Sequence, residues 1–345
     1  VLRATKGDHR KFFYLISIIS ALSASIIADV TISIIFVPLV IRACRILHIK
    51  SAPYIFAISF TINIGSLYSP FSSSENVLIS AVFGLNFTWF LRSFTLYVFP
   101  VLLFTLFLLD ILLLRKINPP KEEYKKILLE IMDPSLVVVD RKYFLLNSIM
   151  FAMIIFGFLF YPSPWVVALI GALIMSLMNS IYFTENTKQI DWKIIFFFIA
   201  LFLLIGCMKM AGIFDIIGDW VKMILPQNEL LAAFTILVMI AVLSGFLAQV
   251  PTALVFITLL QNIYGPNPGD VPQLILMAFL FGINLGSNFL PQGAACDLMA
   301  LNLAEKSNVK EFNYKTLLVR GSLVTIMHIV MSSIYLTLFY YISLS

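Results

Sequence analysis

The chain has 345 residues, of which 61% are hydrophobic and 12% are charged, and its mean hydropathy is +0.99. This composition excludes a soluble globular domain and places the chain in a lipid bilayer. The formal net charge is +5. Because the Lys and Arg residues sit in short connecting segments, they report membrane orientation and require no nucleic-acid partner.

Several stretches are almost free of charge, and some reach the roughly 20 residues that a helix needs to cross a bilayer. They cover 94–114, 144–161, 165–183, 194–208 and 316–343, too many for a signal peptide or a single anchor. The runs lack the alternation of a membrane β-barrel, so we expect helices. The three cysteines show no CxxC spacing, which argues against a disulfide framework or a metal knuckle.

The first apolar stretch, 12–41, lies between basic clusters at 10–11 and 42–45 and contains Asp29. Both ends therefore read as cytoplasmic. One straight helix of this length would measure about 45 Å, against a hydrocarbon core of about 30 Å, and two full crossings would need more residues. We expect a re-entrant hairpin that enters from the basic side.

A long apolar segment at 52–86 follows and is interrupted by NIGSLYSPFSSSEN. Gly, Pro and Ser in its middle indicate two half-helices joined by an unwound stretch. An ordinary span is predicted at 93–115. The charged, amphipathic segment 116–143 is expected to be a cytoplasmic linker with a surface helix.

The second half of the chain shows three ordinary spans and then another hairpin and broken helix. The predicted elements are spans at 144–161, 165–183 and 191–214, a hairpin at 229–263, a broken helix at 272–304 that carries NLGSNFLPQGAACD, and a span at 316–343. Positive charge is scarce around this hairpin, so we expect it to enter from the opposite face, and we expect the C-terminus outside.

An internal repeat links the two halves. An offset of 220 residues pairs Asp29 with Gln249, and an offset of 221 pairs two copies of the spacing N-x-G-S-x-x-x-P, at 63–70 and 284–291. Because the hairpins enter from opposite faces, the copies are inverted. The predicted fold is an all-α polytopic membrane protein with two inverted-topology repeats, each with a re-entrant hairpin and a broken transmembrane helix.

The predicted organisation is a first repeat at 1–115, a linker at 116–143 and a second repeat at 144–345. Three spans precede the second hairpin and none precedes the first. We therefore expect roughly three more helices upstream of Val1, about 90 residues at some 30 per span and loop.

Four segments carry a resemblance to a known family. They are INIGSLYSPFSSSENVLI (62–79), DWKIIFFFIALFLLIGCMKMAGIF (191–214), LSGFLAQVPTALVF (243–256) and INLGSNFLPQGAACDLMALNLAEK (283–306). In these segments the chain resembles the ArsB/NhaD permeases of the ion transporter superfamily, whose relatives include dicarboxylate and citrate carriers. The resemblance extends over about 12–343 and implies a transporter.

The chain departs from the pattern of this family at four places. In the first broken helix, Ser72 to Ser74 and Glu75 stand where Gly and paired Pro are usual, although the closing Asn76 is kept. In the first hairpin Asp29 is followed by Val30, in the second hairpin Gln249 stands where Asn is usual, and in the second broken helix Asp297 replaces Asn. These departures leave the scaffold intact and leave the substrate open.

Asp29, Glu75 and Asp297 are carboxylates at a hairpin tip and at the two breaks, in apolar surroundings. Ionisable groups inside a membrane are costly and are functional candidates by default. Converging carboxylates suit proton binding and release, or with backbone carbonyls a sodium site. Otherwise they cap half-helices or line a wet vestibule. The candidate substrate- and ion-binding residues are Asp29, Thr31, Asn63, Gly65, Ser66, Ser74, Glu75, Asn76, Gln249, Thr252, Asn284, Gly286, Ser287, Asn288 and Asp297.

The leading hypothesis is a secondary active transporter in the cell membrane that moves a small inorganic ion by alternating access, as a Na⁺/H⁺ antiporter or by arsenite-type efflux. The alternative is sodium- or proton-coupled uptake of di- or tricarboxylates, and a channel is a further candidate. Enzymatic motifs and a phosphate-binding loop are absent from the sequence. Besides Na⁺ or H⁺ we expect no cofactor. A homodimer, and an ATPase if efflux is arsenite-type, are the candidate protein partners.

Overall fold

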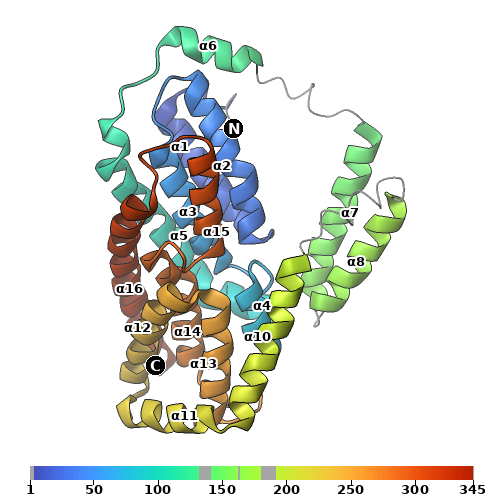
Figure 1. The fold of residues 1–345 in the computed structure, drawn as a ribbon, viewed down its shortest axis with the longest axis vertical. Helices are drawn as coiled ribbons and strands as arrows, with labels where there is room; N and C mark the ends of the chain where they lie inside the picture. Colours follow the sequence, from blue (N-terminus) through green and yellow to red (C-terminus); the bar gives the residue numbers. More distant parts are fainter. Residues whose placement is uncertain (1–3, 132–140, 162–163, 180–191, 345) are drawn as a thin grey trace.

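The computed structural model describes residues 4–131, 141–161, 164–179 and 192–344, and within these ranges it contains helices and no strand (Figure 1). Four of the described helices are long and apolar enough to cross a membrane, and a bent pair at 75° makes a fifth if it is counted as one span. The expected all-α polytopic fold is confirmed.

The segment expected to form the first hairpin contains α1 (His9–Ala24) and α2 (Asp29–Ile46). The Asp8 carboxylate begins α1 by accepting hydrogen bonds from the backbone N–H groups of Arg10 and Lys11, at 2.9 and 3.0 Å. The chain reverses over 25–28 in the interior and returns to the same end (Figure 1).

The second hairpin contains α12 (Glu229–Leu247) and α13 (Gln249–Tyr264). Only Ala248 separates them, with a φ of 68° that lets the chain turn back at once. The backbone N–H of Gln249 donates to the carbonyl of Gly293 at 3.1 Å, which ties this tip to the break in the second broken helix. In Figure 1 this hairpin occupies the lower end of the bundle, and α1 and α2 occupy the upper end.

Each broken helix is interrupted near its proline. The first consists of α3 (Ala52–Ser66) and α4 (Ser74–Phe83), and the second of α14 (Gln273–Gly286), η4 (Ser287–Phe289) and α15 (Ala295–Lys306). At the first break, the Ser72 hydroxyl donates to the carbonyls of Ser66 and Ser69 at 2.6 and 2.9 Å. Side chains therefore satisfy carbonyls that the unwinding leaves without helical partners.

The hairpins pack on the broken helices in a pattern that recurs in both halves. Helix α1 lies on α3 and α12 lies on α14, whereas the second hairpin helices cross over, α2 to α15 and α13 to α4. A Cβ added at Gly65 would meet the backbone of Ala21, and one added at Gly286 would meet Ala241. These two close contacts match at the offsets of the sequence repeat.

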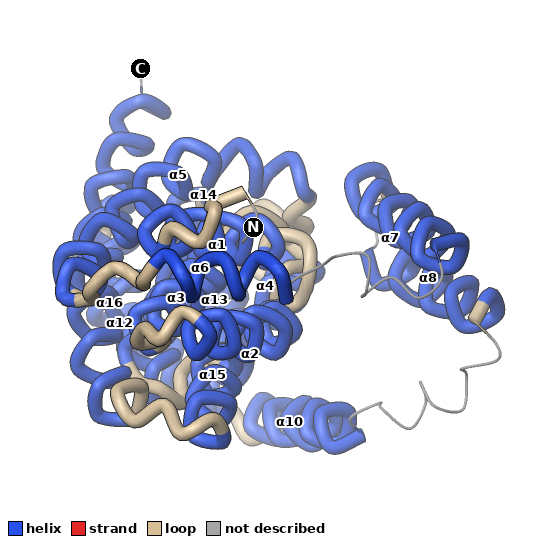
Figure 2. The backbone as a smooth tube through the Cα atoms, turned by 90° about the horizontal axis from the view of Figure 1, so that it is seen from above, coloured by secondary structure: helices blue, strands red, loops and turns tan. Residues whose placement is uncertain are grey.

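The remaining helices flank this centre. They are α5 (Phe87–Leu112), η1 (Leu114–Lys116), α6 (Glu122–Ile131), α7 (Arg141–Phe160), α8 (Pro164–Met178), α10 (Trp192–Met210), α11 (Ile213–Ile224) and α16 (Tyr314–Leu344). Figure 2 shows α7 and α8 as a pair beside the bundle. Of the predicted spans at 165–183 and 191–214, residues 180–191 lie outside the described ranges.

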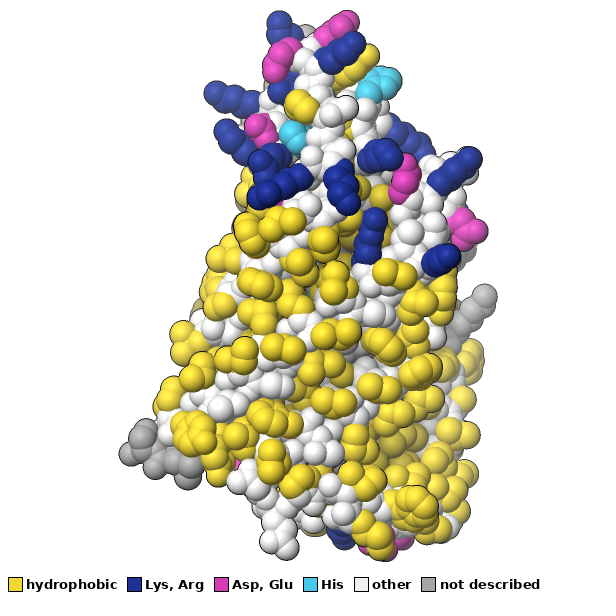
Figure 3. Space-filling model, turned by 90° about the vertical axis from the view of Figure 1, so that its left-hand side faces the viewer, with side chains coloured by type: hydrophobic (Ala, Val, Ile, Leu, Met, Phe, Trp, Pro, Cys, Tyr) yellow, Lys and Arg dark blue, Asp and Glu magenta, His cyan; other side chains and the backbone are white. Residues whose placement is uncertain are grey.

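Basic side chains gather at one end of the molecule, above a broad apolar belt (Figure 3). The loops around α2 and α15 meet there, where the Arg45 guanidinium donates to the Ser307 carbonyl and Lys50 lies 3.4 Å from Glu311. At this end α6 packs on α2, and its Tyr124 ring lies 4.4 Å from the ring of His48. The basic clusters at the start of α1 and the end of α2 thus share one end.

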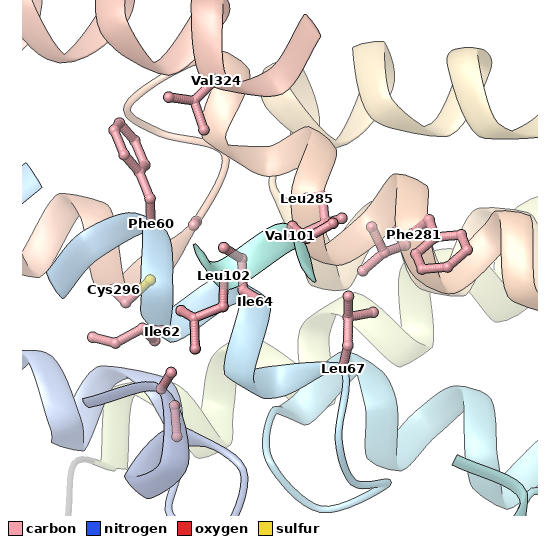
Figure 4. Close-up of a cluster of buried hydrophobic side chains, with 14 of the residues drawn as sticks. Phe60, Ile62, Ile64, Leu67, Val101, Leu102, Phe281, Leu285, Cys296 and Val324 are labelled. Carbon is pink, nitrogen blue, oxygen red and sulfur yellow. The ribbon is translucent and has the colours of Figure 1, made fainter. Parts of the chain in front are cut away.

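Helix α3 is buried on all sides, which is typical of a helix at the centre of a membrane bundle. Figure 4 shows Phe60, Ile62 and Ile64 of α3 among apolar side chains of α5 and α14. Polar residues on α3 therefore lie in an apolar interior, and each of them needs a partner there.

Candidate functional site

Four half-helices begin in the interior, and each has a polar residue in its first turn. Asp29 begins α2, Glu75 lies in α4, Gln249 begins α13 and Asp297 lies in α15. Their exposed fractions are 8, 2, 4 and 0%. A helix N-terminus carries a partial positive charge and free N–H groups, so these starts suit carboxylates and other oxygen-bearing groups.

The three carboxylates form one group around Cys296. Asp29 interacts electrostatically with both Glu75 and Asp297, and Cys296 interacts with all three. Asp297 Oδ1 accepts a hydrogen bond from the Ser59 hydroxyl. Two buried oxygens of the group, Asp297 Oδ2 and Glu75 Oε1, have no hydrogen-bond partner.

No Lys, Arg or His of the described residues forms an ion pair with these carboxylates. The ion pairs within the described part of the chain involve other acidic residues. Nor do the described residues hold three His, Cys, Asp or Glu side chains placed to bind one metal ion together. A cation at this site would therefore take ligands from hydroxyl, amide and backbone oxygens as well.

A second set of contacts consists of amides. Asn76 Nδ2 donates to the Ser66 carbonyl at 2.8 Å, the Ser69 carbonyl at 3.2 Å and the Ser72 hydroxyl at 3.1 Å. Asn76 Oδ1 accepts from Asn284 Nδ2 at 3.0 Å, which joins the first broken helix to the second.

Three further amides, of Asn63, Asn288 and Gln249, extend this connection. Asn63 Nδ2 donates to Asn288 Oδ1 at 2.7 Å, and Asn63 Oδ1 lies 3.3 Å from the thiol of Cys296. Gln249 Nε2 donates to the Ser287 hydroxyl at 3.0 Å. The unwound stretches of both broken helices are thus joined by buried side-chain hydrogen bonds.

Most of the predicted site residues lie in or beside these two groups. Buried there are Asp29, Asn63, Gly65, Ser66, Glu75, Asn76, Gln249, Asn284, Gly286, Ser287, Asn288 and Asp297. Thr31 and Ser74 are exposed instead, although the Ser74 hydroxyl donates to Glu75 Oε2 at 3.5 Å. Thr252 is buried, and its hydroxyl donates to the Ala248 carbonyl of its own first turn. Gly65 and Gly286 act through close helix packing.

Sequence reasoning missed four polar residues of the site. Ser59 bonds Asp297, Cys296 contacts Asn63, and Ser69 and Ser72 supply oxygens to Asn76. Ser59 could have been found because it lies four residues before Asn63 and so on the same face of the helix. Nothing local distinguishes the other three from structural residues.

Comparisons with known proteins fit this geometry. A family model described as a citrate transporter (CitMHS) matches residues 1–266 and 165–345, which together cover the chain. An uncharacterized transporter of Mycobacterium tuberculosis is 24% identical over 355 residues, 99% of this chain and 80% of that protein. An arsenical pump membrane protein of Escherichia coli is 23% identical over 321 residues, 90% of this chain and 73% of that protein. The resemblance to ArsB-type permeases and citrate carriers is confirmed.

Proposed function

Because the chain belongs to the citrate transporter family, we propose that it is a secondary active transporter that couples a proton or sodium ion to the movement of a small inorganic ion. One observation carries the proposal: Asp29, Glu75 and Asp297 are buried in the first turns of half-helices that begin in the interior, and no Lys, Arg or His of the described residues forms an ion pair with them. Such a group needs a cation to neutralise it.

The physical argument concerns the cost of buried charge. An ionised carboxylate without a partner is strongly disfavoured in an apolar interior, and several within electrostatic range are disfavoured further. Binding of H⁺ or Na⁺ removes that cost. Release of the cation on the other side of the membrane restores it, which couples the occupancy of the site to the conformation of the protein.

The inverted arrangement of the hairpins suits alternating access. In the proposed topology a site near the midplane, between the halves 1–115 and 144–345, opens alternately to the two sides of the membrane. The linker 116–143 faces the cytoplasm. The end where the basic side chains gather supports this orientation, since Lys and Arg favour the cytoplasmic side (Figure 3). The C-terminus, which follows α16, then lies outside.

Three fixed carboxylates oppose a polyanionic substrate, which favours a small cation or a neutral solute such as arsenite. The relative from Escherichia coli, whose name describes an arsenical pump membrane protein, supports this choice. Uptake of di- or tricarboxylates is the second candidate. The description of the matching family and the interior N-termini of four half-helices, which attract anions, favour it.

The test uses purified protein in liposomes with an internal pH dye. We impose a sodium gradient and follow internal pH, and then measure uptake of labelled arsenite, citrate and succinate under sodium and proton gradients. Cation-driven arsenite flux or sodium-driven pH change supports the leading function, and cation-driven citrate uptake supports the second. Asp297→Asn should abolish flux. The control Asp219→Asn changes an exposed carboxylate of α11 and should leave flux unchanged. Large single-channel currents in planar bilayers would contradict both.

A further inference from the structure

The two inverted half-sites are chemically unlike. Repeat offsets of 220 and 221 pair Asp29 with Gln249 and Asn76 with Asp297. Because α2 packs on α15 and α13 packs on α4, the two acids lie on one pair of packed half-helices and the two amides lie on the other pair. We name the first, with Asp29 and Asp297, the acidic half-site, and the second, with Gln249 and Asn76, the amide half-site.

In the amide half-site, the Asn76 side chain already fills a cage of oxygens. The carbonyls of Ser66 and Ser69 and the hydroxyl of Ser72 all lie within 3.2 Å of Asn76 Nδ2. Carbonyl and hydroxyl oxygens are the ligands that a hard cation prefers. Here they accept hydrogen bonds from an NH₂ group, which occupies the position that a cation would take.

Apart from Glu75, which precedes Asn76 on α4, the polar groups of the amide half-site are neutral as well. Gln249 Nε2 donates to Ser287. The unpartnered oxygens there, Asn284 Oδ1 and Ser69 Oγ, carry no formal charge. A cation entering this half-site would have to displace the Asn76 amide, and the one carboxylate of α4 and α13, Glu75, interacts with Asp29 of the acidic half-site.

The acidic half-site has the opposite chemistry. Asp297, at the position equivalent to Asn76, cannot donate hydrogen bonds when ionised and accepts one from Ser59. Its Oδ2 atom is fully buried and has no partner, so it remains free for a proton or a metal cation. Glu75, which interacts with Asp29, adds a second unpartnered buried oxygen near this half.

We infer that the protein binds its coupling cation only in the acidic half-site, and that the side-chain amide of Asn76 takes the place of a second cation in the inverted half. This inference rests on the proposed function and adds the number and the location of the coupling cations. Each transport cycle then uses a single cation site, although the fold repeats the scaffold for two.

Reciprocal substitutions at the paired positions test the inference. Liposome flux is measured against external Na⁺ and, separately, against pH, and the Hill coefficient for the active cation is compared among variants. We expect a coefficient of about 1 for the natural protein, since the coefficient cannot exceed the number of coupled sites. Asn76→Asp should raise it toward about 2 by creating a second acidic half-site.

Asp297→Asn should abolish cation-dependent flux, and the double variant Asn76→Asp with Asp297→Asn should restore it. Gln249→Glu, at the position equivalent to Asp29, is a second way to add a site. Asn302→Asp on the exposed side of α15 is the matched control and should leave the coefficient unchanged. Size-exclusion profiles establish which variants are folded.

The outcomes separate this inference from the proposed function. If flux through the natural protein depends on neither Na⁺ nor H⁺, the proposed function and the inference are both wrong. A natural coefficient near 2, or cation dependence that survives Asp297→Asn, overturns the inference alone, whether or not Asn76→Asp folds.

Discussion

Replacing Gly65 by alanine tests the close packing of the first hairpin on the first broken helix. A Cβ at this position would lie 2.8 Å from the backbone carbonyl carbon of Ala21 and 2.9 Å from its Cα, and would also meet the carbonyl oxygen. These are backbone atoms, so no side-chain rotation can relieve the contact. Helix α1 must then move away from α3.

The size of the effect follows from the distances. Carbon atoms pack best at about 3.5–4.0 Å, so the helices must separate by roughly 1 Å. Overpacking of this kind costs about 1–3 kcal/mol. Alanine itself favours a helix over glycine by about 1 kcal/mol, which offsets part of the cost. A control with the same substitution and no contact therefore isolates the packing term.

Gly206 in α10 provides that control, because a Cβ there meets nothing within 4 Å. Thermal unfolding in detergent is followed with a thiol-reactive dye that reports exposure of the buried Cys44 and Cys296, after replacement of the exposed Cys207 by serine. We expect Gly65→Ala to be less stable than Gly206→Ala by about 1–3 kcal/mol. Equal unfolding midpoints for the two variants would refute the close α1–α3 contact.

Three further predictions use the same dye assay. Asn284→Ala removes the 3.0 Å bond between the broken helices and leaves a buried amide oxygen unpaired, so we expect a loss of about 1–3 kcal/mol; unchanged stability would contradict the bridge. Arg10→Ala leaves the buried Asp110 carboxylate without its ion-pair partner and should lower the stability. Adding Asp110→Asn should recover most of the lost stability, and no recovery would contradict a stabilising role of this ion pair. Asp8→Ala should cost about 0.5–2 kcal/mol near neutral pH. The backbone N–H of Lys11 holds the pKa of Asp8 below 3.8, so this stabilisation is present above that value and is lost as pH falls through the lowered pKa; a difference that persists in acid would argue against the cap.

Two of the predicted site residues lie close to buried site residues in the sequence but are themselves exposed. Thr31, one of the predicted site residues, is exposed although it lies two positions from the buried Asp29. Two positions along a helix correspond to about 200° of rotation, so Thr31 lies on the other face. Ser74 stands in the same relation to Asn76 and is also exposed. Counting helical faces would have predicted the exposure of both residues.

Only the tertiary structure shows which hairpin helix packs on which half-helix of the broken helices. The sequence shows Asp29, Asn76, Gln249 and Asp297 at equivalent repeat positions, but it does not show which hairpin tip packs on which half-helix. The crossing of α2 to α15 and of α13 to α4 places the two Asp residues on one pair of packed half-helices and the two amides on the other pair. The contrast between acidic and amide half-sites exists only because of that crossing.

The amino-acid sequence alone determined that the chain is helical and membrane-embedded and where its helices break, and it predicts that the two halves repeat. These features depend on apolar run length, on Gly and Pro, and on charge at span ends, which are local properties. The tertiary structure alone decided that Ser59 bonds Asp297 and that Asn284 bonds Asn76. Such contacts join residues more than 200 positions apart, and they depend on how whole helices pack, which no local pattern encodes.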